Sequence, residues 1–386
     1  MSTHLAFCQS QRPWLLDTIE ALVRLESPTP DKTAVDRCGA ELARRLEAIG
    51  GRVTRLPRDR AGDHLRVEFA PAAASAAGKP VLLLGHFDTV WPIGQLERMP
   101  LRTEDGRLHG PGVFDMKAGV ALGMLAVRAL RERGGLTRGV TMLWTADEET
   151  GSATSREAIE DEARRSAAVL VLEPSLPGGV VKTARKGCGQ FELTVHGISA
   201  HAGVDPGKGA SAIHELAAQI GAIAALQDLD RGISVNVGLV DGGSRPNVVA
   251  ERAHAVIDAR VPRREDEARL VSALAALRPT RPGIRLEVTG GFSRPPLERT
   301  PAVARLYEQA RAVAVELGAD LQEGATGGGS DGNFTAALGV PTLDGLGAVG
   351  DGAHALHEHV VIDALPGRAA LLAGLIARLD VSGSPD

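Results

Sequence analysis

Short apolar, β-rich runs alternate with segments of helical periodicity over residues 14–172, and the same texture resumes from 301 to 379. Such an alternation is typical of a largely parallel sheet with helices on both faces. The pattern therefore predicts an α/β fold for these two parts of the chain. The predicted strands lie at 64–69, 81–84, 140–145 and 169–172, and the predicted helices at 14–25, 34–49 and 117–133.

The segment between them has a different order of elements: strand, helix, two strands, helix and strand, which is a ferredoxin-like arrangement. A chain of 386 residues also exceeds the size at which one hydrophobic core stops growing. We therefore expect a discontinuous domain of residues 1–186 and 298–386, with 187–297 inserted as a second domain. Within the insert, strands are expected at 191–197, 233–240, 248–261 and 284–290, and helices at 210–226 and 265–277.

The composition argues against several classes of protein. The formal charge is −5 and the basic residues are dispersed, so there is no electrostatic footprint for nucleic acid or an anionic membrane. No apolar run reaches the roughly 20 residues of a membrane helix, and the N-terminus does not resemble a secretory signal peptide. We expect a cytoplasmic protein that acts on a small polar substrate. The Ala-rich stretch 70–78 is expected to form an exposed loop.

Three cysteines, Cys8, Cys38 and Cys188, are odd in number and widely spaced. This spacing argues against a disulfide framework and against a thiolate zinc cluster. Any bound metal would therefore be held by histidines and carboxylates.

The strand VLLL runs directly into GHFDTV, which carries His86 and Asp88. The carboxyl ends of parallel strands are where open α/β sheets build their ligand sites. His86 is a candidate metal ligand, and Asp88 is a candidate acceptor for its second imidazole N–H. For His86 alone, a hydrogen-bonded histidine at a strand end is the simpler alternative.

Two further segments place acidic residues beside predicted elements. GPGVFDMKAG delivers Asp115 just ahead of a helix, where it could bridge two cations or act as an N-cap worth about 1 kcal/mol. VTMLWTADEETG ends in Asp147, Glu148 and Glu149. A solvated acidic loop is one explanation for these three residues. Alternatively, nearby cations would relieve the repulsion between their charges. One Glu could then bind a cation while the neighbouring Glu acts as a base.

Later segments extend the pattern. The strand AAVLVLEPS ends at Glu173, another carboxylate at a strand end. GLGAVGDGAHALHEHV then offers His354, His357 and His359, of which one need face the site. A nonspecific surface cluster is the alternative, and His359 in the strand-like HVVI is expected to be structural.

Two histidines and three carboxylates, one of them bridging, suit a pair of zinc ions with an open position for water. Two such ions lower the pKa of a shared water and polarise a carbonyl, while a neighbouring carboxylate moves the proton. Glu148 fits the role of that base.

Together these segments resemble the dinuclear-zinc exopeptidase and aminoacylase family, which includes glutamate carboxypeptidase, acetylornithine deacetylase, succinyl-diaminopimelate desuccinylase and peptidase T. The likeness spans nearly the whole chain. It rests on GHFDTV, GPGVFDMKAG, TADEETGS, LEPS, SAHAG, RPNVV, GGGSDG and AHALHE, which occur in the family's order. It implies a zinc-exopeptidase-like mixed sheet flanked by helices, with an inserted lid and dimerisation domain, and therefore a homodimer.

By this resemblance two Zn²⁺ ions, for which Co²⁺ or Mn²⁺ could substitute, share Asp115 as a bridge. His86 and Glu173 would complete one site, and Glu149 and His354 the other.

The resemblance also assigns Glu148 as the base. His354 is chosen because the family has a His four residues before a Glu, here Glu358, whereas His357 stands where relatives usually carry a small polar residue.

In the inserted domain, the motif SAHAG carries His201. By the resemblance, His201 would reach the partner subunit's site and polarise the substrate carbonyl there. Asn247 in RPNVV, Arg260 in DARVP and Arg294 in FSRPP would bind or position the substrate and its carboxylates. The GGGSDG loop, with Gly328 and Gly329, lacks the Lys and Ser/Thr of a phosphate-binding P-loop and would present backbone groups to the substrate. Asp331 would support this loop or cap the next helix.

The sequence around ARKG, TGGGSDG and the RP segment at Arg294 is most like that of glutamate carboxypeptidases. We therefore expect hydrolysis of the amide bond of a C-terminal amino acid, glutamate in the first instance, from a peptide or N-acyl conjugate. An N-acyl amino acid deacylase is the alternative. A catalytically inactive metal-binding homologue is disfavoured because every expected ligand and Glu148 are present.

Overall fold

The computed structural model describes residues 3–72 and 78–379, so the expected loop at 70–78 lies largely outside the described residues. The chain divides into two compact units. The inserted segment begins at Ala184 in this division, where the sequence pattern suggested 187. The first unit comprises Met1–Thr183, Arg299–Ala325 and Ser330–Asp386, and the second comprises Ala184–Glu298 and Thr326–Gly329.

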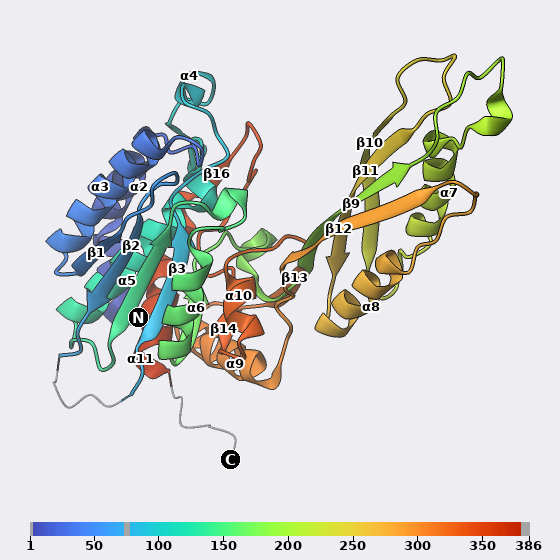
Figure 1. Ribbon diagram of the computed structural model, residues 1–386. Helices are drawn as coiled ribbons and strands as arrows, with labels where there is room; N and C mark the ends of the chain where they lie inside the picture. Colours follow the sequence, from blue (N-terminus) through green and yellow to red (C-terminus); the bar gives the residue numbers. More distant parts are fainter. Residues whose placement is uncertain (1–2, 73–77, 380–386) are drawn as a thin grey trace. The chain divides into compact units, whose positions relative to one another are not determined.

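A six-stranded mixed sheet forms the centre of the first unit, which confirms the α/β class (Figure 1). β3 is parallel to β6 and β7, and β7 is parallel to β14, whereas β1 and β2 are antiparallel to their neighbours. The sheet is less uniformly parallel than the alternation suggested, because no helix intervenes between β1 and β2. In spatial order the strands are β1 (Arg52–Leu56), β2 (His64–Phe69), β6 (Val140–Thr145), β3 (Val81–His86), β7 (Ala168–Val171) and β14 (Thr342–Leu343).

Helices cover both faces of this sheet because its central strands are apolar on both sides (Figure 1). Successive side chains of a strand point to opposite faces. Accordingly, Leu82 and Leu84 of β3 pack in one buried cluster, and Val81 and Leu83 in the larger one. The first cluster includes side chains of α6 (Arg156–Arg165) and α10 (Gly332–Ala337), and the second includes those of α5 (Ala118–Glu132) and α11 (Leu365–Arg378).

The three helices predicted in this part form with their ends shifted by one or two residues. An Asp31 side chain that accepts a hydrogen bond from the Ala34 N–H, at 3.0 Å, begins one of them. α1 and β1 were not predicted, because an eight-residue helix and a mostly exposed five-residue strand show too little periodicity. The remaining helices of this unit are α1 (Thr3–Ser10), α2 (Arg12–Arg24), α3 (Lys32–Ala48), α4 (Gln95–Arg98) and α9 (Pro301–Glu316).

A smaller sheet joins two distant parts of the first unit. Its spatial order is β15-β16-β5-β4, and β16 pairs antiparallel with β5. The segment that follows β5 therefore lies beside the segment that precedes β16. The strands are β4 (Arg102–Glu104), β5 (Arg107–His109), β15 (Gly350–Asp351) and β16 (His359–Val361), and a separate pair is formed by β8 (Val181–Arg185) and β13 (Glu323–Thr326).

The second unit has the expected β-α-β-β-α-β order. Its four strands are all antiparallel to their neighbours in the order β10-β11-β9-β12, and one buried cluster joins them to both helices. This confirms the ferredoxin-like prediction. The elements are β9 (Gly187–His196), α7 (Ala212–Ala224), β10 (Ser234–Gly242), β11 (Arg252–Val261), α8 (Arg264–Ala275) and β12 (Arg285–Arg294).

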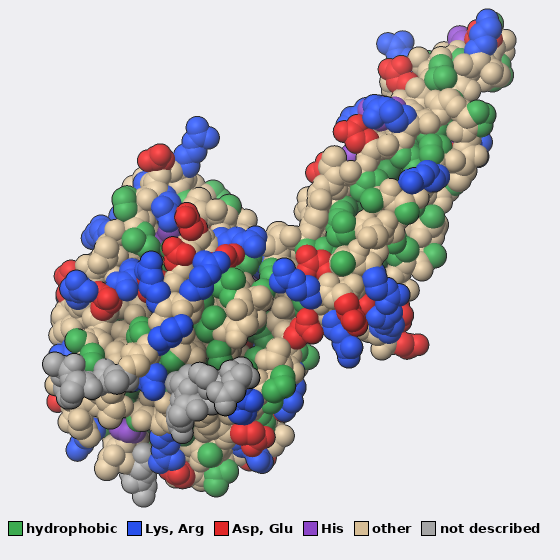
Figure 2. Space-filling view, turned by 60° about the horizontal axis from the view of Figure 1, so that its bottom comes forward, with side chains coloured by type: hydrophobic (Ala, Val, Ile, Leu, Met, Phe, Trp, Pro, Cys, Tyr) green, Lys and Arg blue, Asp and Glu red, His purple; other side chains and the backbone are tan. Residues whose placement is uncertain are grey.

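On the face drawn in Figure 2, Lys and Arg side chains are interspersed with Asp and Glu side chains. Among the described residues, no helix has the length and apolar content required to cross a bilayer.

Candidate metal centre

The parallel strands β3, β6 and β7 bring their carboxyl ends to one edge of the sheet. His86 at the end of β3 is level with Thr145 at the end of β6, and Leu84 is level with Val171 at the end of β7. The polar residues that follow these ends therefore gather at this edge. They include Glu148 and Glu149 in the short η2 helix (Glu148–Thr150), and Glu173.

His86 is almost fully buried, and each ring nitrogen faces a defined group. Its Nε2 lies 3.4 Å from Asp115 Oδ1 and 3.6 Å from Glu173 Oε1. Its Nδ1 lies 3.0 Å from the Asp88 carbonyl oxygen and 3.4 Å from Asp88 Oδ1. The backbone of Asp88 is thus the nearer acceptor, which the sequence did not predict. A proton held on Nδ1 leaves Nε2 to face the carboxylates.

The Asp88 carboxylate has a second role in the turn that follows β6. It accepts a hydrogen bond from Thr29 Oγ1 at 2.7 Å, and the backbone N–H groups of Glu148 and Glu149 approach it at 3.4 and 3.3 Å. Asp88 therefore ties the acidic turn to the end of β3.

Asp115 lies between two histidines. Its Oδ1 faces His86, and its Oδ2 is 3.4 Å from Nε2 of His354. Asp115 sits in the irregular segment Val113–Lys117, and α5 begins only at Ala118 without a side-chain cap. The alternative that Asp115 caps the helix is therefore wrong.

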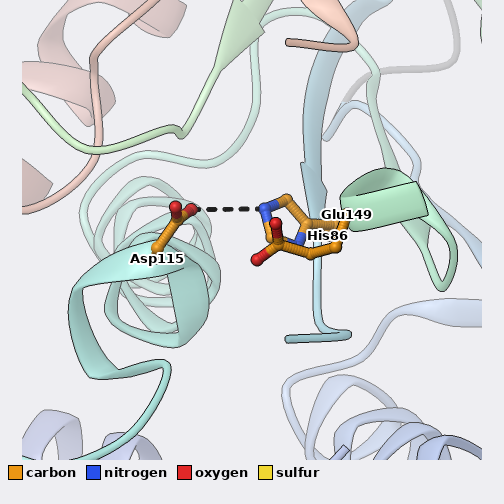
Figure 3. A group of neighbouring side chains, drawn as sticks. All are labelled: His86, Asp115 and Glu149. Carbon is orange, nitrogen blue, oxygen red and sulfur yellow. Dashed lines mark ion pairs between the residues drawn. The ribbon is translucent and has the colours of Figure 1, made fainter. Parts of the chain in front are cut away.

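Glu149 and His354 also belong to this group of side chains around Asp115. Glu149 Oε2 lies 3.2 Å from His354 Nε2. Of the three neighbouring histidines, His354 joins this group, whereas His357 lies 3.9 Å from Asp351 at the surface and Nδ1 of His359 faces the His357 carbonyl oxygen at 2.9 Å. Figure 3 shows His86, Asp115 and Glu149 pointing toward one another.

The donor set fits metal ions. Among the described residues, His86, Asp115 and Glu149 offer ligand atoms within 4.8 Å of one another. Within residues 3–72 and 78–379, Glu149 Oε1 and Asp115 Oδ1 are buried without a hydrogen-bond partner, although Asp115 Oδ1 lies 3.4 Å from His86 Nε2. Buried carboxylate oxygens without partners are costly unless a cation compensates them. Imidazole and carboxylate ligands suit zinc and related divalent ions.

The electrostatics agree with that fit. Contacts with Asp115 and Glu149 raise the pKa of His354 to about 10. Burial alone would lower the pKa of His86, but its contacts with Asp115 and Asp88 raise it well above its usual value. Burial raises the pKa of Glu149. Protonated histidines thus balance the carboxylates, a role that passes to the cations when neutral histidines bind them.

Two buried aspartates support the turn that carries Glu148 and Glu149. Asp331 accepts hydrogen bonds from Thr145 Oγ1, at 3.1 Å, and from Ser152 Oγ, so it joins the residues on either side of the turn. Asp147 Oδ2 accepts from the N–H and hydroxyl of Thr154, at 2.7 and 2.8 Å. Asp331 thus supports the acidic turn, which the sequence did not predict, and it stands at the N-cap position of α10 without a side-chain cap bond.

Glu358 is nearly fully buried and holds the loop that carries Asp115. Its carboxylate accepts hydrogen bonds from the N–H groups of Gly112 (2.9 Å), Phe114 (2.9 Å) and Asp115 (3.1 Å). A fourth bond comes from Trp91 Nε1 at 2.8 Å. Burial raises the pKa of Glu358 to about 7, against the effect of these donors. The sequence singled out Glu358 only as part of a motif, and nothing in it pointed to Trp91.

Two predicted residues lie together in the second unit. Nδ1 of the exposed His201 accepts from the N–H groups of Gly203 and Val204, both at 3.1 Å. In the neutral ring the proton therefore resides on Nε2. The Ala202 N–H donates to the Asn247 carbonyl oxygen at 3.0 Å, which places the two motifs side by side.

A second group of predicted residues in this unit meets around Cys188. Arg260 forks onto Asp258 and donates to Cys188 Sγ at 2.7 Å. A side chain at Gly329 would meet Cys188 Sγ at 2.9 Å and Cδ of the buried Arg294 at 3.0 Å. The carbonyl groups of Gly328 and Gly329 each accept from Arg185, at 3.1 Å. The close packing explains why glycine occupies position 329.

Residues 82–378 match the model of peptidase family M20/M25/M40. The chain belongs to this family. It is therefore a metallopeptidase or amidohydrolase, and the expected resemblance is confirmed.

The curated relatives cover the chain almost completely. Carboxypeptidase G2 of a Pseudomonas species is 30% identical over 375 residues, which are 96% of this chain and 90% of that protein. Succinyl-diaminopimelate desuccinylase of Xanthomonas oryzae pv. oryzae is 30% identical over 394 residues, covering 95% and 98%. Among solved structures, aminopeptidase PepT of Bacillus cereus has a TM-score of 0.79 at 22% identity, covering 96% of this chain and 99% of that one, and supports the shared fold.

Proposed function

We propose that this metallohydrolase cleaves the amide bond of a C-terminal amino acid, glutamate in the first instance, from a peptide or N-acyl conjugate. The observation that carries the proposal is the position of Asp115 between His86 and His354, with Glu149 and Glu173 beside the two histidines. These contacts support a pair of divalent cations that would share Asp115.

We assign one Zn²⁺ to His86, Asp115 and Glu173 and the other to Asp115, Glu149 and His354, with Co²⁺ or Mn²⁺ as substitutes. Bound divalent ions supply Lewis-acid polarisation of the scissile carbonyl and lower the pKa of water at the site.

In this proposal Glu148 is the general base. One of its carboxylate oxygens takes a proton from the attacking water while the water oxygen bonds to the carbonyl carbon. Glu148 then delivers that proton to the leaving nitrogen as the C–N bond breaks. Glu148 lies in η2 directly before Glu149, and the backbone N–H groups of both residues approach the Asp88 carboxylate. These contacts support the role because they fix the turn that carries Glu148.

His201 is proposed to donate from Nε2 to the developing oxyanion. The two backbone N–H groups that occupy its Nδ1 support this, because they fix the tautomer. By family resemblance the chain forms a homodimer through the second unit, and His201 serves the partner subunit's site. Asn247, Arg260 and Arg294 are proposed to position the substrate and its carboxylates, with Gly328 and Gly329 presenting backbone groups.

A second candidate is an N-acyl amino acid deacylase. The succinyl-diaminopimelate desuccinylases support it, since they match this chain over nearly its full length at 27–30% identity. Both activities use the same amide chemistry and differ in which side of the bond carries the recognised group.

The test is turnover by the zinc-loaded protein of a matched panel: N-acyl glutamates, N-acetyl and N-succinyl amino acids with other side chains, and dipeptides. A preference for C-terminal glutamate across different acyl groups supports the carboxypeptidase. A preference set by the acyl group, whatever the amino acid, supports the deacylase. Zinc binding without turnover of any panel member contradicts both.

The base assignment predicts that Glu148→Gln lowers kcat by about 10²- to 10⁴-fold, because the proton acceptor is lost while the ligands remain. Zinc stoichiometry, measured by elemental analysis, should be unchanged. Glu157→Gln, at an exposed position in the first turn of α6, is the matched control and should retain full turnover. Wild-type kcat in Glu148→Gln would remove the assignment.

A further inference from the structure

Glu358 stands outside the proposed ligand set, yet its carboxylate accepts hydrogen bonds from three backbone N–H groups of the Asp115 loop. We propose that Glu358 is the positioning residue of the metal pair: its carboxylate fixes the loop of the bridging Asp115 against the segment that carries His354. The inference rests on the proposed function and deepens it, because it names the residue that fixes the positions of the proposed ligands Asp115 and His354 relative to each other.

The contacts use the whole acceptor capacity of the carboxylate. Oε1 accepts from the N–H groups of Phe114 and Asp115, and Oε2 accepts from the N–H of Gly112 and from Trp91 Nε1, all at 2.8–3.1 Å. An ionised carboxylate offers about four lone-pair sites, so each finds a donor. One side chain thereby fixes three backbone N–H groups within residues 112–115.

The loop depends on such a partner because it has no regular secondary structure of its own. Gly112 has φ +70° and Asp115 has φ −112° and ψ 95°, which are not helical angles, and their N–H groups donate to Glu358. Buried N–H groups without acceptors cost about 1–3 kcal/mol each in general. Removing Glu358 therefore releases the loop that carries Asp115, although Asp115 itself is unchanged.

The same residue is part of the His354 segment. Between them the chain makes a tight turn, with hydrogen bonds from the N–H of Ala355 to the Gly352 carbonyl oxygen (2.8 Å) and from the N–H of Glu358 to the Ala355 carbonyl oxygen (3.0 Å). Any side chain at Gly352 would meet the Glu358 backbone at 2.9 Å. Glu358 and Asp115 are 243 positions apart in the sequence. A single residue thus connects the bridging ligand to the His ligand across that separation.

Glu358→Gln and Glu358→Ala test the inference in complementary ways. The Gln variant keeps the size of the side chain but turns one oxygen into an NH₂ group. Since each oxygen faces two N–H donors, either orientation sets the NH₂ against two donors. We therefore expect Gln to be no better than Ala. Trp91→Phe removes one donor and leaves the three backbone contacts, so it should have the mildest effect.

The matched control is Glu162→Gln. Glu162, on α6, is also a nearly buried glutamate of the first unit, but it binds Arg66 of β2 and Arg165 of α6 rather than the Asp115 loop. It should lower stability without changing metal affinity. It therefore separates loss of positioning from a general loss of stability.

Two readouts are needed. The first is zinc affinity of the metal-free full chain, titrated against a chromophoric chelator, where both Glu358 variants should bind about 10- to 100-fold more weakly than wild type. The second is amide hydrogen exchange of residues 112–115 in the metal-free protein, which should accelerate in the Glu358 variants and stay at the wild-type rate in Glu162→Gln.

The outcomes separate the two proposals. Unchanged exchange at 112–115 in both Glu358 variants, or zinc affinity within twofold of the Glu162→Gln control, overturns the positioning role. Wild-type protein that binds no zinc refutes the proposed function, while the exchange arm still decides whether Glu358 holds the loop. Faster exchange together with weaker zinc binding supports the inference.

Discussion

Among the described residues, the hydrogen-bond acceptors of the buried Arg368 side chain on α11 are backbone carbonyl groups. Its Nε, Nη1 and Nη2 donate to the carbonyl oxygens of Gly347 (2.8 Å), Gly179 (2.8 Å) and Gly345 (2.5 Å). Burial lowers the pKa of Arg368 to about 10, so the side chain remains charged at neutral pH. The guanidinium therefore joins three loop carbonyls to the helix.

Arg368→Met keeps the length of the side chain and removes all three donors. Each buried carbonyl left without a donor costs about 1–3 kcal/mol, or roughly 3–9 kcal/mol for three. Removing a buried charge returns a desolvation penalty of several kcal/mol, which offsets part of this. We expect a net loss of about 3 kcal/mol. At about 2–4 °C per kcal/mol for a unit of this size, Tm should fall by roughly 6–12 °C.

The assay is calorimetric unfolding of the metal-free protein, with the transition of the first unit followed separately. Arg378→Met is the matched control, because Arg378 lies on the same helix and pairs with Glu316 at the surface. An exposed pair contributes about 0–1 kcal/mol, so this variant should melt within a few degrees of wild type. If Arg368→Met and Arg378→Met melt at the same temperature, the reasoning from carbonyl satisfaction is refuted.

Two other predictions concern the turn that carries Glu148. Asp331→Ala should destabilise the first unit by about 2 kcal/mol in chemical denaturation and Asp331→Asn by less, because the hydroxyls of Thr145 and Ser152 can donate to or accept from an amide; equal losses would contradict this account. The ring nitrogens of His64 face the N–H of Ala146 and the Thr154 hydroxyl, and burial lowers the pKa of this histidine. Below about pH 6.5 the unfolded chain therefore binds more protons than the folded chain. The free energy of unfolding falls as the pH drops below that value. The wild-type free energy of unfolding should therefore fall more steeply between about pH 7 and pH 5 than that of His64→Gln; parallel curves would contradict the buried neutral histidine.

The sequence predicted the fold wherever a local pattern repeats. The apolar runs at 81–84 and 140–145 form the central strands β3 and β6. A strand whose side chains are apolar on both faces of a sheet is stable only when helices cover both faces. The direction of β1 and β2 was not predictable from alternation, since no connecting helix is present to reveal it. The extent of the second unit includes Thr326–Gly329, which belongs there through contacts distant in sequence.

For the candidate site, the sequence placed carboxylates at strand ends but not the partners of each one. His86, Glu149 and Glu173 follow from the rule that parallel strands end at one edge. The pairing of the Asp88 carboxylate with Thr29, and of Glu358 with Trp91, depends on loop paths that no periodicity encodes. Family resemblance identified the motifs, whereas the contacts identify the partners of Asp88 and Glu358.

Five of the acidic residues around the centre, Asp88, Asp115, Glu149, Asp331 and Glu358, fall into two groups according to how their oxygens are used. Asp88, Asp331 and Glu358 have carboxylates whose oxygens accept hydrogen bonds from hydroxyl or backbone groups. In the part of the chain that the structure describes, Asp115 and Glu149 each keep a buried oxygen without a hydrogen-bond partner and turn another toward His354. A carboxylate saturated by donors has little left to offer a cation, whereas an unsatisfied buried oxygen gains most from one. The structure thus distinguishes supports from proposed ligands among residues that are chemically alike in the sequence.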